Sequence, residues 1–149
     1  MRIYIDTSVV GGVFDREFKD ATAKFFAKVN EGDIVLVVSE LLERELKLAP
    51  SHVREYLASF PASQIEKVEL SQTAVDLANE YIAERVVGAT SVADCQHIAI
   101  ATIARADVLV SWNFKHIVNL RRIRGYNAVN LKNIYPMLEI RTPEEVIDQ

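Results

Sequence analysis

The sequence predicts an α/β fold in which helices cover both faces of a central parallel sheet. Residues 3–5, 34–38 and 108–110 are short apolar runs, and they lack the alternation of a half-exposed strand, as is typical of strands buried on both faces. Segments with helical periodicity separate these runs, and that alternation favours a parallel sheet. We expect one domain over residues 1–149, because no linker-like segment interrupts the chain and its length suits a single core.

Residues that start or stop helices bound most of the expected helices. In chain order these helices run from Asp20 to Gly32, Ser39 to Pro50, Ser51 to Pro61, Ser71 to Gly88, and Ser91 to Arg105. Gly88 is expected at the position just after the fourth helix, where a left-handed residue is common. Residues 138–140 are expected to form a short edge strand. Thr142-Pro143-Glu144-Glu145 is a capping box and predicts a final helix.

The composition excludes several classes of protein. Half of the residues are apolar, which argues against a disordered chain. No apolar run approaches the about 20 residues of a membrane-spanning helix, and an aspartate as early as Asp6 argues against a signal peptide. The single cysteine, Cys95, excludes an internal disulfide and suits a reducing compartment. We therefore expect a cytoplasmic protein without a membrane partner.

Charge is unevenly distributed along the chain. The net charge of −4 argues against broad, non-specific attachment to nucleic acid, which relies on neutralising many phosphates. Residues 115–124 are nevertheless strongly basic and contain no acidic residue. Their cationic residues are candidates for contacts with RNA phosphates; they are Lys115, Arg121, Arg122 and Arg124. The alternative is an ordinary solvated face of a helix.

Polar residues follow all three predicted strands. The first strand runs into Asp6-Thr7-Ser8, the second into Ser39-Glu40 and the third into Ser111-Trp112-Asn113. The carboxyl ends of parallel strands share one edge of a sheet, where open α/β folds bind ligands. Asp6 could instead cap the following helix, and the two roles can coexist. We therefore expect a functional site at this edge.

Glu45 is the most informative acidic residue. On a helical wheel it falls within an apolar stripe, whereas the other charged residues of its helix lie opposite and pair at i,i+4 spacing. An unpaired buried carboxylate is costly, so a cation should compensate Glu45, and a metal ion is the economical candidate. The alternative is a glutamate at the margin of the stripe that reaches water.

Asp94 supplies a third carboxylate, in the first turn of an apolar helix. Ser91 precedes it by three residues, so a purely structural capping box is an alternative. Three clustered carboxylates would suit Mg²⁺ or Mn²⁺, and a metal-activated water could then attack a phosphodiester. His97 lies on the same helical face as Asp94, but we expect it to be a hydrogen-bonded core residue.

These residues carry a resemblance to the PIN-domain family, specifically to VapC-type toxins of bacterial toxin–antitoxin pairs. The order of four motifs over residues 1 to about 120 resembles the family pattern. IYIDTSVV matches at Asp6, VVSELLEREL at Glu45, SVADCQHIAIA at Asp94, and LVSWNFKHI at Ser111 and Asn113.

The resemblance implies a three-layer α/β/α sandwich, a Mg²⁺- or Mn²⁺-dependent endoribonuclease, a homodimer and a neutralising antitoxin. Asp6, Glu45 and Asp94 would be the catalytic residues and metal ligands. Four residues would support them or ligate weakly, namely Thr7, Ser39, Ser111 and Asn113. Asn113 stands where the family usually has an aspartate, so a second metal ion is expected to bind weakly, while the first site is intact.

Two other functions compete with a nuclease. One is a PIN-like module that binds RNA or protein without cutting, which Asn113 favours because it weakens the acidic cluster. The other is a phosphotransfer receiver or phosphatase-like domain built around Asp6. Receivers need an acidic pair after the first strand and such phosphatases need Asp-x-Asp, whereas here Thr7 and Ser8 follow Asp6.

Overall fold

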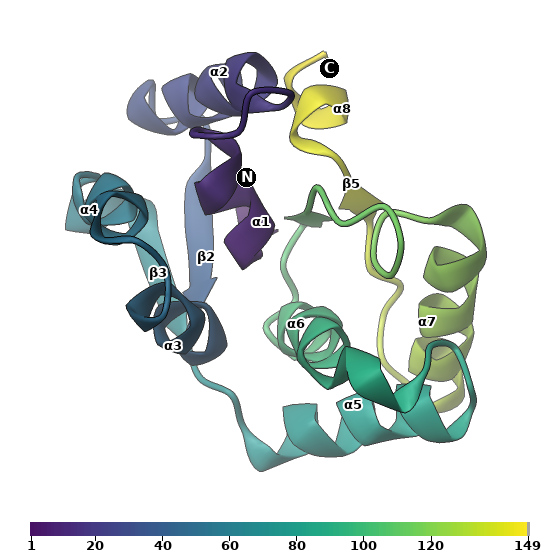
Figure 1. Ribbon diagram of the computed structural model, residues 1–149. Helices are drawn as coiled ribbons and strands as arrows, with labels where there is room; N and C mark the ends of the chain where they lie inside the picture. The colour runs from purple at the N-terminus through teal and green to yellow at the C-terminus, as the bar shows by residue number, and fades with distance from the viewer. Residues whose placement is uncertain (149) are drawn as a thin grey trace.

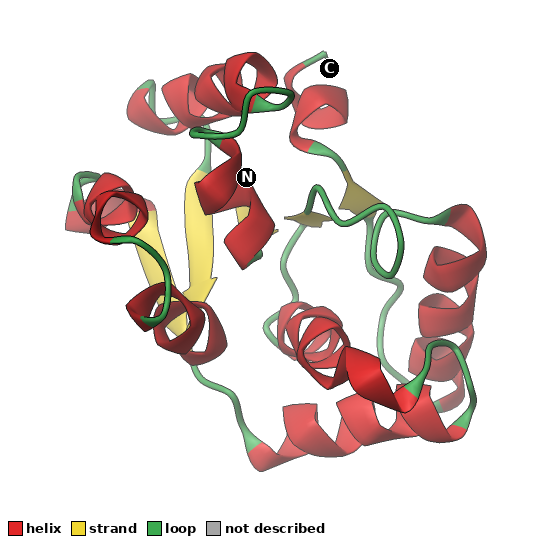
Figure 2. Ribbon diagram, viewed as in Figure 1, coloured by secondary structure: helices red, strands yellow, loops and turns green. Residues whose placement is uncertain are grey.

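Five parallel strands form one sheet with helices on both faces (Figures 1 and 2). The structure is a computed structural model that describes residues 1–148, so the final residue of the predicted domain, Gln149, lies outside the described residues. The strand order is β3-β2-β1-β4-β5. The strands are β1 (Arg2–Ile5), β2 (Val35–Ser39), β3 (Ile65–Val68), β4 (Val108–Val110) and β5 (Ile140–Arg141).

The helices cover the sheet in two layers. They are α1 (Thr7–Gly12), α2 (Lys19–Asn30), α3 (Glu40–Lys47), α4 (Ser51–Ala58), α5 (Gln72–Ala83), α6 (Val92–Ile103), α7 (Leu120–Lys132) and α8 (Pro143–Ile147). Short 3₁₀ turns, η1 (Ala62–Gln64) and η2 (Ala89–Ser91), precede β3 and α6. In Figure 1, α2 and α8 lie side by side at one end of the molecule, and α5, α6 and α7 gather at the other.

Each face of the sheet has its own apolar core. Tyr4 of β1 packs with α5, α6 and α7, whereas Ile3 and Ile5 point the other way and pack with α1, α2, α4 and α8. All three side chains are fully buried, because successive residues of a strand point to opposite faces and both faces are covered. The three-layer α/β/α architecture expected from the sequence is therefore confirmed.

The three apolar runs all become strands, but two other strand predictions need correction. β3 was not predicted, because Glu66 and Lys67 interrupt its apolar pattern at the edge of the sheet. The predicted strand at residues 138–140 is displaced to Ile140–Arg141. Leu138 is buried but its backbone N–H and C=O bond the side chain of Asn127 instead of a strand. The side-chain amide of Asn127 thus takes the place of the neighbouring strand that the apolar pattern predicted as the hydrogen-bond partner of Leu138.

Helix ends also differ from expectation at one place. Gly32 adopts a positive φ of 89° just after α2, as a helix stop should. The predicted stop at Gly88 is wrong, because α5 ends at Ala83 and Arg85 takes the left-handed conformation, with φ 59°. Val86 explains the early end, since α7 holds it from two sides: the Arg122 guanidinium donates to its carbonyl, and its side chain packs against Gly125.

The connectivity places a topological switch point at the carboxyl ends of β1 and β4. From β1 the chain adds β2 and β3 on one side, then returns to place β4 and β5 on the other. Ligands bind at such a switch point in open α/β sheets. Asp6 directly follows β1, and Ser111 directly follows β4. Within residues 1–148, no helix has the length and apolar character needed to cross a membrane.

We predict different effects of alanine at the two glycines of α1. A Cβ on Gly12 would lie 2.8 Å from Thr22 Oγ1 and 2.9 Å from Trp112 Nε1, the two atoms of a buried hydrogen bond. Gly12→Ala should therefore lower the free energy of unfolding by about 1–3 kcal/mol. A Cβ on Gly11 would meet no atom within 4 Å, so Gly11→Ala should be neutral or stabilise by up to about 1 kcal/mol. Equal urea midpoints for the two variants would contradict the close approach at Gly12.

Candidate active site

Asp6 is a buried carboxylate that also caps a helix. Its side chain is 4% exposed, and its Oδ1 accepts hydrogen bonds from the Val9 N–H at 3.3 Å and from Ser8 Oγ at 2.6 Å. Ser111 Oγ donates to Oδ2 at 2.6 Å. Burial is the main cause that raises the pKa of Asp6; the charge of a protonated His97 and the bonds from Ser111, Ser8 and Val9 oppose it without reversing the shift. Asp6 therefore caps α1 and also lies at the carboxyl edge of the sheet, and the sequence analysis had allowed for both.

Glu45 reaches the same region from α3. Its Oε1 accepts from Thr7 Oγ1 at 2.7 Å and lies 2.6 Å from His97 Nε2. Burial alone would raise the pKa of Glu45, but the hydrogen bond and charge of His97, together with the bond from Thr7, outweigh burial and lower it. The side chain is 33% exposed, so it lies at the margin of the apolar stripe. His97 supplies part of the compensation that the sequence assigned to a metal ion.

Asp94 lies in the first turn of α6. The Asn113 side-chain N–H donates to its Oδ1 at 3.2 Å, whereas Ser91 makes no side-chain capping bond. Burial is the largest cause that raises the pKa of Asp94. The charges of Asp6 and Glu45 raise it further, whereas the histidines nearby lower it. The three carboxylates therefore share one electrostatic neighbourhood.

Hydrogen bonds join the segments that carry these carboxylates. Ser111 Oγ, which donates to Asp6, also accepts the Asn113 N–H at 2.9 Å. Thr7, next to Asp6, donates to Glu45, and Asn113 donates to Asp94. Because His97 and Asp94 share α6, these contacts form a closed ring through the ends of β1 and β4 and through α3 and α6.

Asn113 uses both ends of its amide in this ring. Its Oδ1 accepts the backbone N–H groups of Lys115 at 3.2 Å and His116 at 3.0 Å, so it caps the turn that follows. Its Nδ2 faces Asp94. An aspartate here would keep the cap but would place a like charge against Asp94, which explains how an amide fits this position.

The residues fit a hard divalent cation in donor type. Within the described part of the chain, Asp94 Oδ2 and Glu45 Oε2 accept no protein hydrogen bond, and carboxylate oxygens suit Mg²⁺ or Mn²⁺. Among residues 1–148, however, no group of three or more Asp, Glu, His or Cys side chains is arranged to hold a metal ion. Mg²⁺ commonly binds one or two carboxylates and keeps its waters. That mode suits the arrangement better than direct ligation by all three acids.

The fold has a counterpart among solved structures. A chain in the crystal structure of VapBC2 from Rickettsia felis, bound to a DNA fragment from their promoter, superposes with a TM-score of 0.59. The alignment covers 95% of this chain and 98% of that chain, at 15% sequence identity. The chain has a PIN-like fold. No family model matches the sequence, and no curated protein matches it either.

The PIN-like fold brings some predicted residues to the site and leaves others apart. Ser39 caps α3 through Leu42 and bonds the Tyr4 hydroxyl, and among the described residues it forms no hydrogen bond with any of the three carboxylates. Arg121 and Arg124 are exposed on α7, whereas Arg122 bonds the carbonyl of Val86. Lys115 lies in the turn capped by Asn113. These cations stay predictions as RNA contacts.

Sequence reasoning missed the contacts that His97 makes with Glu45 and Tyr4. It correctly expected His97 to be buried and hydrogen-bonded, but it named no partner. The signal that could have found the contact was the Asp94-x-x-His97 spacing, which sets both side chains on one face of α6. Nothing local in the sequence points that face at Glu45.

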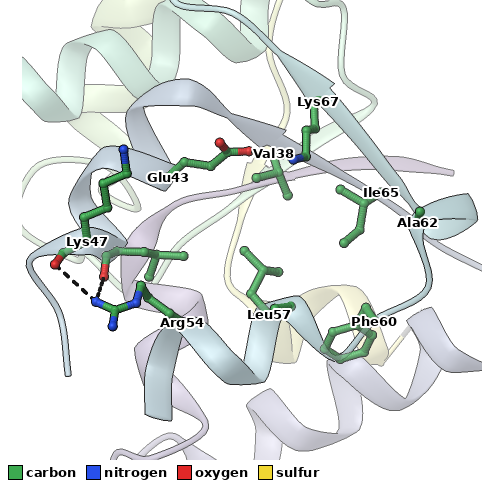
Figure 3. Close-up of a pocket in the computed structure, with 11 residues that line it drawn as sticks. Val38, Glu43, Lys47, Arg54, Leu57, Phe60, Ala62, Ile65 and Lys67 are labelled. Atoms are coloured by element: carbon green, nitrogen blue, oxygen red, sulfur yellow. Dashed lines mark hydrogen bonds and ion pairs between the residues drawn. The ribbon is translucent and has the colours of Figure 1, made fainter. Parts of the chain in front are cut away.

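The PIN-like domain also has an apolar cavity away from these acids. It has a volume of about 580 Å³ and lies beside the edge strand β3, with none of the predicted site residues in its lining (Figure 3). Leu57, Phe60 and Ile65 point into it, and Arg54 at its rim donates to the carbonyl of Lys47. The guanidinium is thus used to hold the end of α3.

We predict that Asp6→Asn stabilises the metal-free protein at neutral pH. Because burial raises the folded-state pKa of Asp6, the native state binds this proton more tightly than the unfolded state. The free energy of unfolding therefore falls as pH rises from the unfolded pKa, about 3.9, through the folded pKa. Asn removes that cost, so the advantage of the variant should grow over this window and then stay constant.

The measurement is urea unfolding in EDTA between pH 4 and pH 8. Asp76→Asn, at an exposed position of α5, is the matched control and should show no such growth. A stability difference between the two proteins that does not change between pH 4 and pH 8 would contradict the raised pKa.

Proposed function

We propose that this protein is a Mg²⁺- or Mn²⁺-dependent endoribonuclease and the toxin of a toxin–antitoxin pair. The supporting observation is the convergence of Asp6, Glu45 and Asp94 at the switch-point edge of a PIN-like sheet, each held by donors from another segment. Such an acidic cluster repels RNA phosphates by itself, so a cation must join it for RNA to bind. The order of the four sequence motifs adds support.

The chemistry divides between the ion and the chain. A bound divalent ion would offset charge on the scissile phosphate and lower the pKa of an attacking water. Asp6 has two hydroxyl donors and a backbone N–H that keep its carboxylate in one orientation. Glu45, with its lowered pKa, stays ionised at neutral pH and offers Oε2 to the site. Asp94 is held by Asn113 through Oδ1, which leaves Oδ2 for the reaction.

The proposed partners are an RNA substrate, an antitoxin and a second copy of the chain. One similar solved structure is of VapBC2, which supports a protein partner of the antitoxin type. The homodimer and the cytoplasmic location rest on the sequence resemblance and on the single cysteine, Cys95. Exposed Lys115, Arg121 and Arg124 are the candidates for the RNA path.

A second function is a PIN-like module that binds RNA or protein without cutting. The observation in its favour is that, within residues 1–148, no group of three ligands is ready for a metal ion. A further point is that the amide oxygen of Asn113 is taken up by backbone N–H groups. The two functions differ in one measurement, which is cleavage of RNA in Mn²⁺ and its loss in EDTA.

We predict that Asp6→Asn, Glu45→Gln and Asp94→Asn each lower RNA cleavage at least about 100-fold, because each removes charge that the site needs to hold a cation and orient water. Rates should be measured in Mn²⁺ with an RNA that the wild type cuts, and circular dichroism should show folded variants.

Glu43→Gln is the matched control for Glu45→Gln. Glu43 lies on the same helix but lines the cavity beside β3, 3.4 Å from Lys67 Nζ. This control should cut at the wild-type rate. Three acid variants that cut as fast as the wild type would overturn the assignment of the site, and a wild type that binds RNA without cutting would favour the binding module.

We predict that replacing Lys115, Arg121 and Arg124 with Gln weakens RNA binding and its salt dependence. Each phosphate contact to single-stranded RNA contributes about 0.7 to the slope of log affinity against log salt, so the slope should shrink by up to about 2. Arg122 is left in place because it bonds Val86. The control replaces three exposed cations near and on α2, namely Arg16, Lys19 and Lys24. Equal slopes for both triple variants would remove residues 115–124 from the RNA path.

A further inference from the structure

His97 is a buried imidazole with both ring nitrogens engaged. It is 3% exposed, its Nε2 lies 2.6 Å from Glu45 Oε1, and its Nδ1 lies 2.5 Å from the Tyr4 hydroxyl. The Tyr4 ring is fully buried and meets the imidazole edge-on, with ring centroids 5.7 Å apart. Ser39 Oγ lies 2.8 Å from the Tyr4 hydroxyl and accepts the Leu42 N–H. A chain of side chains thus runs from the core to Glu45.

The direction of the bond to Glu45 follows from the chemistry of its ends. An ionised carboxylate only accepts hydrogen bonds, so the proton between the two groups is on Nε2. At Nδ1 the Tyr4 hydroxyl either donates its proton, with Ser39 donating to Tyr4, or accepts one while it donates to Ser39. In both arrangements Nε2–H is directed at Glu45, and Tyr4 restrains the ring from the other side.

The bonds to Glu45 fall on one oxygen. Thr7 and His97 both bind Oε1, whereas Oε2 accepts no hydrogen bond from the described residues. Two donors on one oxygen define the plane and direction of a carboxylate that would otherwise rotate about several bonds. His97 is also one turn of α6 beyond Asp94, so the same helix carries one acid and orients another.

We propose that His97 is the positioning residue of the active site, with Tyr4 holding the imidazole so that its Nε2–H anchors Glu45 Oε1 and leaves Oε2 for the reaction. This role rests on the proposed ribonuclease function. His97 does not touch substrate in it; it acts through Glu45. Partners that orient a ligating side chain typically contribute 10–100-fold to activity.

Replacing His97 with glutamine or asparagine tests whether the residue orients Glu45 or only fills space. The amide nitrogen of Gln can occupy the place of Nε2 and donate to Glu45, whereas that of Asn reaches only the place of Nδ1, beside Tyr4. We expect His97→Asn to lower kcat for RNA cleavage about 10–100-fold with KM changed less than about 3-fold. His97→Gln should recover most of that loss, and Tyr4→Phe should lower kcat by a smaller factor than His97→Asn. Equal losses in the Gln and Asn variants, or none in Asn, would overturn the proposal.

Nuclear magnetic resonance tests the contact without relying on activity. In the full-length protein, a long-range ¹H–¹⁵N spectrum should show a proton on His97 Nε2. Glu45→Gln should move that proton upfield, because a neutral acceptor replaces a charged one; Glu43→Gln should leave it in place. An unprotonated Nε2, or a resonance indifferent to Glu45→Gln, would contradict the proposal. A wild type that cuts no RNA would defeat the proposed function, while the spectra would still decide whether His97 holds Glu45.

Discussion

The parallel register of β1 with β2 and β4 is the constraint on which the candidate active site depends. Tyr4 of β1 pairs with Val37 on one side and Leu109 on the other, so all three strands end at one edge. The segments that follow must then share a small volume, and their polar residues become neighbours. Asp6 and Ser111 bond across 105 positions of sequence for this reason. The site therefore forms only when the sheet forms.

Most hydrogen-bond donors around the three carboxylates are uncharged groups. Hydroxyl and amide donors from Ser8, Ser111 and Asn113 orient Asp6 and Asp94 but bring no full positive charge. A single imidazole faces Glu45, and no lysine or arginine bonds any of the three acids among the described residues. The hydroxyl and amide donors therefore orient Asp6 and Asp94 without neutralising them, whereas at Glu45 the hydrogen bond and charge of His97 contribute to the lowered pKa. Burial is the main cause that raises the pKa values of Asp6 and Asp94, and the hydrogen bonds to Asp6 do not reverse it.

Much of the architecture could be predicted, although α1 and α7 were not, and the failures at β3 and α5 have physical causes. The three central strands were predictable because burial on both faces demands unbroken apolar runs. β3 was not, because an edge strand tolerates Glu66 and Lys67. The end of α5 was misplaced, since α7 holds Val86 and Arg85 takes the left-handed turn that Gly88 was expected to make. The local sequence pattern predicted the uniformly buried strands correctly. It misplaced the end of α5, where residues distant in the sequence make the deciding contacts.

For the site, the sequence by itself determined which acids follow which strands and that Glu45 lies in an apolar stripe needing compensation. The chemistry of an acidic, oxygen-rich edge follows from those residues alone. Only the tertiary structure decided the partners: His97 meets Glu45 across 52 positions, and Asn113 meets Asp94 across 19. Helical periodicity shows which face a residue occupies, but packing against the sheet sets where that face points. The donor that holds each carboxylate is therefore a property of the folded chain.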